Sequence, residues 1–365
     1  MNEFGLRFPS VLLSTLAIYL TYRISKNLFN SEKIALLAAF FHAVNGLILE
    51  VTGGRVSTDH VDLFFLFFVE LGVFFATQYL HRTTILNCVF IGLSIGIAVL
   101  CKWLTALIVI PVWLILAFNP IRYRLLFLHL ITVLFTATVV FLPWHLYVFY
   151  KFPLEAKWES SLYTRHLTEV IEGRTGPWYY FLNSAMSSFN ELLFIIFGWW
   201  IYSLCCKKYD VRLLALWIWF MIPLLFFSFA KTKMQGYLLF TGPAIFILVA
   251  HFSSTISAYN TTTKPRRWLI NGMVFLTVLL PIRYCIERLK PFQGVDQRKV
   301  DATWRIKKLN DGTIPGNTVV FNNPNYIETM FYTSFISYEW MPSKAEETFL
   351  QEKGYRIYIL PDLKK

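Results

Sequence analysis

The chain has 365 residues, of which 56% are hydrophobic and only 15% charged, and its mean hydropathy is +0.50. Soluble domains carry about 25% charged residues, so this composition excludes a water-soluble globular protein and predicts a polytopic membrane protein. The net charge of +12 resides mostly in short loops, and no base-reading motif accompanies it, which argues against a nucleic-acid partner.

Ten apolar runs predict an all-α membrane unit over 1–290, because about 20 helical residues cross the ~30 Å core of a bilayer. The run 85–118 is too long for one crossing, and Lys102 at its middle predicts a turn between two short spans. The expected spans are 8–28, 34–49, 61–80, 85–101, 103–118, 125–150, 179–204, 212–230, 236–254 and 268–284.

Lys and Arg concentrate in alternate loops, which predicts that those loops are cytoplasmic. The basic loops lie near residues 23–33, 82, 122–124, 207–212 and 264–267. With ten spans, both ends of this chain are expected on the outer side of the inner or plasma membrane. The lipid bilayer is therefore the first predicted partner.

The tail from 291 to 365 changes character, because short strand-like segments alternate with helical ones. This pattern predicts a small outer α/β domain. The expected helices are 295–309 and 345–353, and the expected strands are 317–323, 333–340 and 355–360.

Several ionisable residues lie in loops predicted to face outward. Asp59 precedes the span at 61, where it either caps the helix or belongs to a functional site. Lys231 and Lys233 stand on the side with fewer cations; they either snorkel toward headgroups or bind a phosphate. Lys102 is a third outer cation, and three such cations at helix ends could converge on one anion.

The longest outer loop, 151–178, combines aromatic rings with ionisable groups, a mixture that suits a sugar. His166 in this loop is a candidate metal ligand or acid–base group. The candidate sugar or acceptor contacts are Trp158, Tyr163, Arg165, Arg174 and Trp178.

The order of these motifs resembles the GT-C membrane glycosyltransferases that use polyprenyl-phosphate sugars, namely the aminoarabinose lipid A transferases and protein O-mannosyltransferases. The similarity runs through nearly the whole chain. The segments that carry it are 2–10, 55–59, 101–102, 142–144, 176–180, 230–233 and 237–239, together with His166.

The resemblance implies specific roles. Asp59 takes an acidic catalytic position, and His166 takes a metal-ligand position. Gln235 and Phe240 stand where relatives usually carry prolines, and Trp103 replaces a glycine. The donor phosphate is expected to face Lys102, Lys231 and Lys233, with Tyr237 beside them.

The implied reaction moves a sugar from a polyprenyl-phosphate donor to a lipid, glycan or protein acceptor, with inversion. Lysines neutralise the departing phosphate, and a carboxylate takes the acceptor proton. A divalent metal ion is the one cofactor that the resemblance allows. The alternative function, from another class, is a polytopic transporter or lipid flippase, for which Glu70 and Glu191 are the candidate intramembrane charges.

In relatives, a span and an outer loop with Asp-Glu and Glu-Lys-Pro-Pro motifs precede the segment that resembles 2–10. Neither motif occurs in this sequence. We therefore expect an amino-terminally truncated form that lacks the catalytic base. Such a chain would bind the donor and transfer sugar poorly, because a general base contributes about 10²–10⁴-fold.

Overall fold

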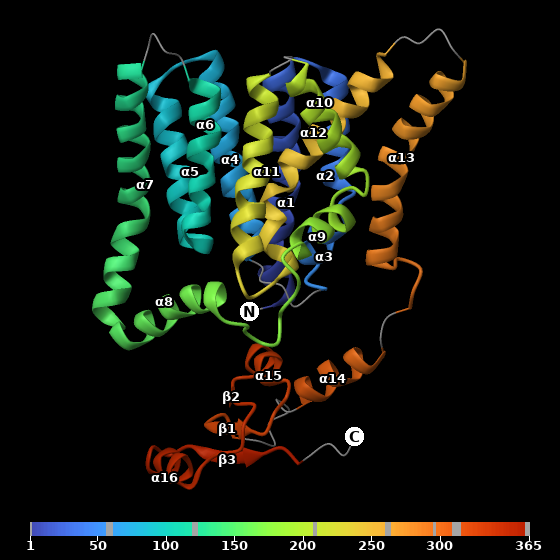
Figure 1. The fold of residues 1–365 in the computed structure, drawn as a ribbon. Coiled ribbons are helices and arrows are strands. Elements are labelled where there is room, and N and C mark those ends of the chain that lie inside the picture. Colours follow the sequence, from blue (N-terminus) through green and yellow to red (C-terminus); the bar gives the residue numbers. More distant parts are fainter. Residues whose placement is uncertain are drawn as a thin grey trace. The chain divides into compact units, whose positions relative to one another are not determined.

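A computed structural model describes residues 2–55, 61–118, 123–206, 210–259, 264–294, 297–308 and 315–361. The chain divides into two compact units, Asn2–Lys290 and Pro291–Lys365. The first is helical and the second is α/β (Figure 1). Asp59 lies outside the described residues.

The helical unit contains long apolar helices joined by short connections. In the described part of the chain, seven helices are long and apolar enough to cross a bilayer, or nine if each of two bent pairs is one span. The elements are α1 (Glu3–Phe29), α2 (Glu32–Ala43), α3 (Gly46–Thr52), α4 (Val61–His81), α5 (Ile85–Lys102), η1 (Trp103–Ile108), α6 (Val109–Ala117), α7 (Tyr123–Lys151), α8 (Pro153–Thr168), α9 (Tyr180–Ser188), α10 (Leu193–Cys205), α11 (Val211–Phe229), η2 (Gln235–Thr241), α12 (Gly242–Ser257) and α13 (Lys264–Leu289).

The prediction of a polytopic helical membrane protein is confirmed, and the irregularities are local. The predicted span 103–118 is a 3₁₀ turn followed by the nine-residue α6. The predicted spans 34–49 and 179–204 are bent pairs, α2–α3 at 53° and α9–α10 at 104°.

Asparagine side chains explain both bends, because they compete with the helix for backbone hydrogen bonds. Asn45 Oδ1 accepts from Ile48 N at 3.0 Å and so starts α3 anew. Asn190 Oδ1 accepts from Leu192 N at 2.9 Å, and its Nδ2 donates to Thr277 O of α13 at 3.1 Å. The freed polar groups are thus satisfied inside the unit.

Small residues set the spacing between α5 and α7. A Cβ added at Gly92 would lie 2.6 Å from Val133 O, and one at Gly96 would lie 2.8 Å from Ala137 O. Only glycine allows the backbones to approach so closely, which is a common device between membrane helices. This packing fixes the lower end of α5, where Lys102 lies.

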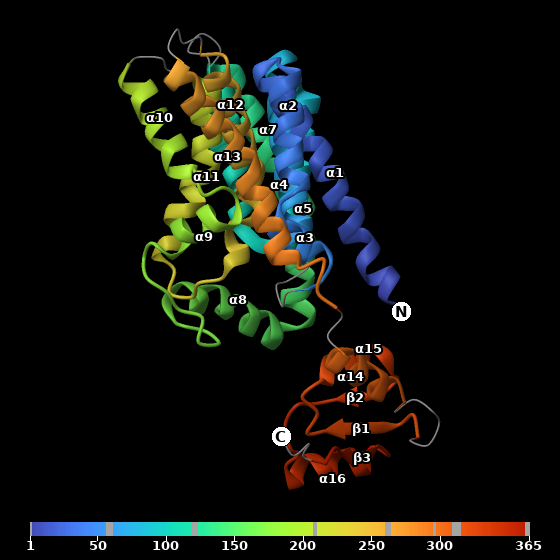
Figure 2. The same cartoon turned by 90° about the vertical axis from the view of Figure 1, so that its right-hand side faces the viewer.

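The tail forms a parallel sheet with strand order β2-β1-β3, and Figure 2 shows the strands one below another in this order. Val319 pairs with Ile336 on one side and with Ile357 on the other. The predicted α/β organisation is confirmed, with the additional helix α15 between the first two strands. The elements are α14 (Gln297–Lys308), β1 (Thr318–Phe321), α15 (Tyr326–Tyr332), β2 (Ile336–Ser337), α16 (Lys344–Glu352) and β3 (Arg356–Ile359).

Candidate functional site

Lys102 ends α5 and pairs with a buried carboxylate. Its ammonium donates to Asp62 Oδ1, and the Asp62 side chain is 3% exposed whereas that of Lys102 is 26% exposed. Asp62 lies in the first turn of α4, where the helix dipole stabilises a negative charge. An ammonium has three N–H donors, so this one can also reach an incoming anion.

Tyr237 and His166 complete this cluster. The ring of Tyr237 in η2 lies 5.3 Å from Lys102 Nζ, measured to its centroid. The Tyr237 hydroxyl contacts Nδ1 of His166 in α8 at 3.0 Å. Burial lowers the pKa of His166, as do the nearby Lys102 and two arginines, while Glu172 raises it. The imidazole is therefore neutral at pH 7 and suited to hydrogen bonding.

The turn after α11 is tied to the end of α8. Thr232 N donates to His166 O at 3.1 Å, and Thr232 Oγ1 donates to Glu169 O at 2.8 Å. Lys233 N donates to Arg174 O at 2.9 Å. These bonds bring the long loop and the lysine motif together, although about 60 residues separate them in the chain.

The two lysines of this turn have different surroundings. Lys231 is exposed, whereas Lys233 is 6% exposed. Lys233 Nζ donates to Ser228 O at 2.7 Å and to Phe227 O at 3.2 Å, and lies 5.3 Å from the Phe181 ring centroid. Burial lowers the pKa of Lys233, and so does Lys231. Its contacts favour capping of α11, so Lys231 is the better placed of the two for a phosphate.

Two predicted arginine contacts are held in ion pairs along the same loop. Arg165 Nε bonds Glu169 at 2.9 Å, and Arg174 bonds Glu172 at 3.0 Å. Both guanidinium groups act electrostatically on His166. They add positive charge near the Lys102 cluster without contacting Lys102 in any bond described.

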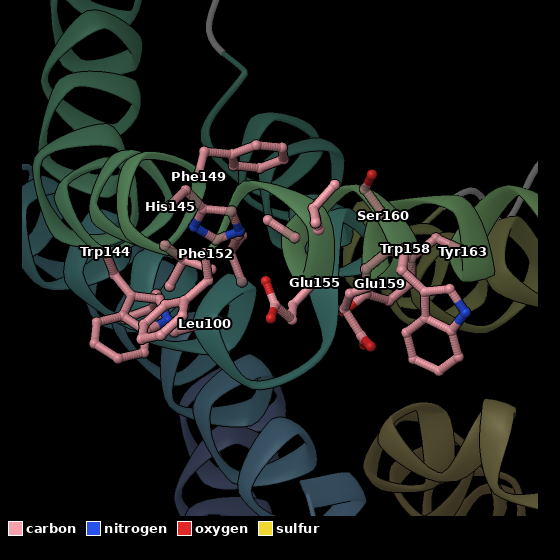
Figure 3. Close-up of a pocket in the computed structure, with 14 residues that line it drawn as sticks. Leu100, Trp144, His145, Phe149, Phe152, Glu155, Trp158, Glu159, Ser160 and Tyr163 are labelled. Atoms are coloured by element: carbon pink, nitrogen blue, oxygen red, sulfur yellow. The ribbon is translucent and has the colours of Figure 1, made fainter. Parts of the chain in front are cut away.

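A cavity of about 900 Å³ lies between α5, α7 and α8 (Figure 3). Trp158 and Tyr163, two of the predicted sugar or acceptor contacts, line it. Trp178 lies elsewhere: it is 75% exposed and lines a separate cavity of about 420 Å³ beside α10 and α11. The larger cavity is lined by Val99, Leu100, Trp144, His145, Val148, Phe149, Phe152, Leu154, Glu155, Ala156, Trp158, Glu159, Ser160 and Tyr163.

The described residues do not make up a metal site. No group of three His, Cys, Asp or Glu side chains gathers in this part of the chain, and His166 Nδ1 is engaged with a tyrosine hydroxyl. Zinc and similar ions need three or more protein ligands. The described geometry therefore supplies no step through a metal.

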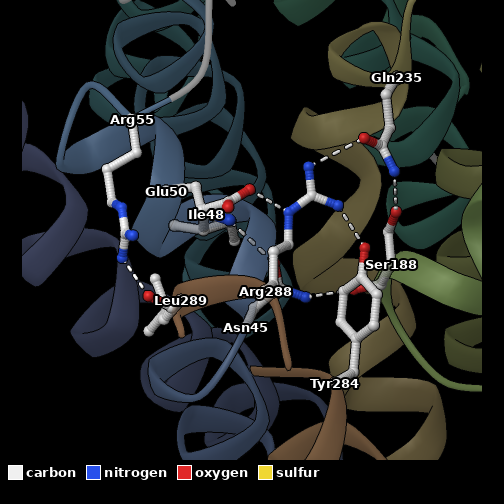
Figure 4. A network of polar contacts seen from close by, with 9 residues as sticks. All are labelled: Asn45, Ile48, Glu50, Arg55, Ser188, Gln235, Tyr284, Arg288 and Leu289. Carbon is white, nitrogen blue, oxygen red and sulfur yellow. Dashed lines mark hydrogen bonds and ion pairs between the residues drawn. The ribbon is translucent and has the colours of Figure 1, made fainter. Parts of the chain in front are cut away.

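A second polar network centres on Arg288 (Figure 4). Its guanidinium pairs with Glu50 of α3, donates to the Tyr284 hydroxyl, and donates to Gln235 Oε1 at 2.9 Å. Gln235 Nε2 in turn donates to Ser188 Oγ at 3.1 Å. Gln235, a departure from the family pattern, thus links η2 to α9 and α13.

Sequence reasoning missed Asp62 and Arg288, and it counted Glu155 and Glu159 among the ionisable groups of the loop 151–178 without giving either a role of its own. Asp62 offered a signal, since it follows Asp59 by three residues at the start of a span. Glu155 and Glu159 are four residues apart, a spacing that places both on one helix face. Arg288 gave no signal, because two of its partners, Glu50 and Gln235, come from distant segments.

The sequence is similar to several known proteins, all of which are named as sugar transferases. The family described as dolichyl-phosphate-mannose-protein mannosyltransferase matches residues 1–147. An undecaprenyl phosphate-alpha-4-amino-4-deoxy-L-arabinose arabinosyl transferase of Pseudomonas fluorescens is 24% identical over 77% of this chain and 49% of its own length. One from Proteus mirabilis is also 24% identical, over 68% of this chain and 46% of its own. The chain thus spans about half the length of the curated relatives it matches.

Solved structures match the fold of the chain. ArnT from Cupriavidus metallidurans, bound to undecaprenyl phosphate, aligns with a TM-score of 0.63 and 15% identity over 98% of this chain and 76% of its own. The Archaeoglobus fulgidus oligosaccharyltransferase aligns with a TM-score of 0.56 and 13% identity over 98% of this chain and 58% of its own.

The comparisons first define the class: the chain is a polytopic membrane protein that shares its fold with ArnT and with the oligosaccharyltransferase, and residues 1–147 are similar to the mannosyltransferase family. Within that class its curated relatives are aminoarabinose transferases, which confirms the resemblance seen in the sequence.

Proposed function

We propose that this protein is a glycosyltransferase that moves a sugar from a polyprenyl-phosphate donor to an acceptor on the outer face of the membrane. The observation that carries the proposal is the Lys102–Asp62 pair beside Tyr237 and His166. A partly exposed cation held by a buried carboxylate is a suitable contact for a phosphate.

The chemistry follows from the leaving group. A polyprenyl phosphate departs as a stable anion, so the site must neutralise negative charge and needs no general acid. Lys102 and Lys231 supply that charge. Lys233, predicted from sequence as a third phosphate contact, acts in this proposal by holding the turn in place.

The acceptor must lose a proton, which requires a base within hydrogen-bond reach. The family resemblance gives Asp59 the second acidic position of the site, where it supports the base rather than replacing it. Trp158 and Tyr163, in the cavity wall, are the proposed acceptor contacts. Arg165 and Arg174 add positive charge near His166. The proposal that Trp178 contacts the sugar or acceptor rests only on its position in the loop 151–178.

The names of the relatives indicate which class of sugar donor to expect. They are named for transfer of 4-amino-4-deoxy-L-arabinose from undecaprenyl phosphate. We extend that donor class, a pentose or hexose on an undecaprenyl-type phosphate, to this chain. The proposed acceptor class is a lipid, glycan or protein.

The orientation is also proposed. Lys and Arg distribution places loops near 82, 122, 208 and 266 in the cytoplasm and the tail outside. Single cysteines at Ser254 and Ser343 test this with a membrane-impermeant thiol reagent on intact cells. Labelling at Ser343 alone is expected, and labelling at Ser254 alone would reverse the orientation.

A transfer assay tests the activity. The protein is reconstituted with a radiolabelled undecaprenyl-phosphate sugar and a membrane extract as acceptor source. Label is expected to enter an acceptor covalently but slowly, because neither the Asp-Glu nor the Glu-Lys-Pro-Pro motif occurs in this sequence. Robust transfer that Asp59→Asn abolishes would instead make Asp59 the base. Movement of the intact donor between leaflets without covalent change would favour the flippase instead.

A further inference from the structure

The cavity between α5, α7 and α8 has an acidic edge. Glu155 and Glu159 lie one turn apart on α8, and both carboxylates face the cavity in Figure 3. Among the described residues that line it, none is a lysine or an arginine. The remaining wall is mainly aromatic and aliphatic, so the cavity combines an apolar interior with a negative rim.

Neither carboxylate is neutralised by a neighbouring cation. In the described ranges, Glu155 and Glu159 take part in no ion pair, whereas Glu169 at the end of the same helix pairs with Arg165. Two unneutralised carboxylates on one helix face repel each other modestly. A cationic group placed between them would relieve that repulsion.

The cavity adjoins the Lys102 cluster through two shared helices. Leu100 in the wall precedes Lys102 by two residues on α5, and Tyr163 precedes His166 by three on α8. The cationic cluster and the acidic cavity edge therefore lie on the same two helices. Two ligands of different headgroup charge could occupy neighbouring places.

We propose that this cavity binds an amphiphile whose headgroup carries a primary amine. The hydrocarbon chain packs against Leu100, Trp144 and Phe149, while the ammonium meets Glu155 and Glu159. A phosphate headgroup would meet two carboxylates and be repelled.

The test uses two photoreactive probes of equal chain length, a dodecylamine and a dodecyl phosphate, each with a diazirine in the chain. The full-length protein is placed in phosphatidylcholine nanodiscs, and crosslinked peptides are mapped by mass spectrometry. Saturable labelling of α7 and α8 by the amine is expected. The Glu155→Gln/Glu159→Gln variant should weaken it roughly five- to thirtyfold, since each exposed pair contributes up to about 1 kcal/mol.

Glu347→Gln, a change of an exposed carboxylate on α16, serves as the matched control and should leave labelling unchanged. Equal labelling by both probes, or unchanged amine affinity in the double variant, would overturn the inference. Undecaprenyl phosphate binding is measured on the same samples. If undecaprenyl phosphate binds and the amine does not, the proposed function stands and the amine site is wrong. If the amine binds and undecaprenyl phosphate does not, the amine site stands and the proposed function is wrong.

Discussion

Two polar networks in the helical unit each contain a buried ion pair, yet they differ in how completely the cation is used. Arg288 is 17% exposed and engages Glu50, Tyr284 and Gln235. Lys102 is 26% exposed, and Asp62 is its one acceptor among the described contacts. The first network is saturated, whereas the second leaves donors for another molecule.

The difference separates a structural role from a binding role. A guanidinium whose three nitrogens all have partners holds helices in register and has little left for a ligand. An ammonium with one partner is oriented by it and can still bind an anion. The two networks thus predict opposite effects of mutation on stability and on binding.

Replacing Arg288 should have the largest effect. Arg288→Ala leaves the carboxylate of Glu50 buried without its cation, which costs about 3–5 kcal/mol in typical buried pairs. Thermal unfolding in detergent should show a clear loss of stability. Arg283→Ala is the matched control on the same helix, because Arg283 is 51% exposed and its pairs with Glu191 and Glu287 lie at the surface. If Arg288→Ala and Arg283→Ala lowered stability equally, the Arg288 network would not have the structural role assigned to it.

Replacing Lys231 should act on binding. Lys231→Ala is expected to weaken undecaprenyl phosphate binding by about 1.5–3 kcal/mol, the contribution of a hydrogen bond to a charged group. Its melting temperature should stay close to that of the parent protein, because the side chain is exposed. Native mass spectrometry with added undecaprenyl phosphate measures the affinity. Lys157→Ala, another exposed lysine outside the cluster, should leave the affinity unaltered.

Replacing Lys233 should act on stability instead. Lys233→Met keeps the aliphatic stem and removes the ammonium that bonds Ser228 O and Phe227 O. Phe227 O still accepts from Ala230 N at 3.1 Å, so the loss falls mainly on Ser228 O, and a polar group left without its partner costs about 1–3 kcal/mol. A lowered melting temperature with a smaller change in phosphate affinity than Lys231→Ala is expected. A larger loss of phosphate affinity in Lys233→Met than in Lys231→Ala would show that Lys233 binds the phosphate.

Lowering the pH should have the smallest effect. Burial holds the pKa of His166 below its usual value of about 6.5, so the unfolded chain takes up this proton more readily. The stability that neutral His166 provides is present above about pH 6.5 and is lost as the pH falls below it. Between pH 7.5 and 5.5, the free energy of unfolding should fall less with decreasing pH in His166→Gln than in the parent protein. Identical slopes would show that His166 is not perturbed.

Much of the fold could be predicted because apolar runs of about 20 residues report membrane helices directly. The breaks at Asn45 and Asn190 could not, since each depends on a side-chain bond that only the packed unit defines. The shortness of α6 was hidden for the same reason.

The site could be predicted in part. Lys102 and Tyr237 were expected beside one phosphate and do lie together, and His166, expected as a metal ligand, contacts the Tyr237 hydroxyl. Asp62 was missed because its partner is 40 residues away. Lys231 and Lys233 look equivalent in the sequence, and only the position of the α11 end distinguishes them.

The central claim is that Lys102 binds the donor phosphate. The most direct test compares undecaprenyl phosphate affinity in the parent protein and in Lys102→Ala/Asp62→Asn, which removes the cation without leaving a buried charge. We predict a loss of about 1.5–3 kcal/mol, or roughly ten- to a hundredfold, in a protein that remains folded. Unchanged affinity in the folded double variant would contradict the account.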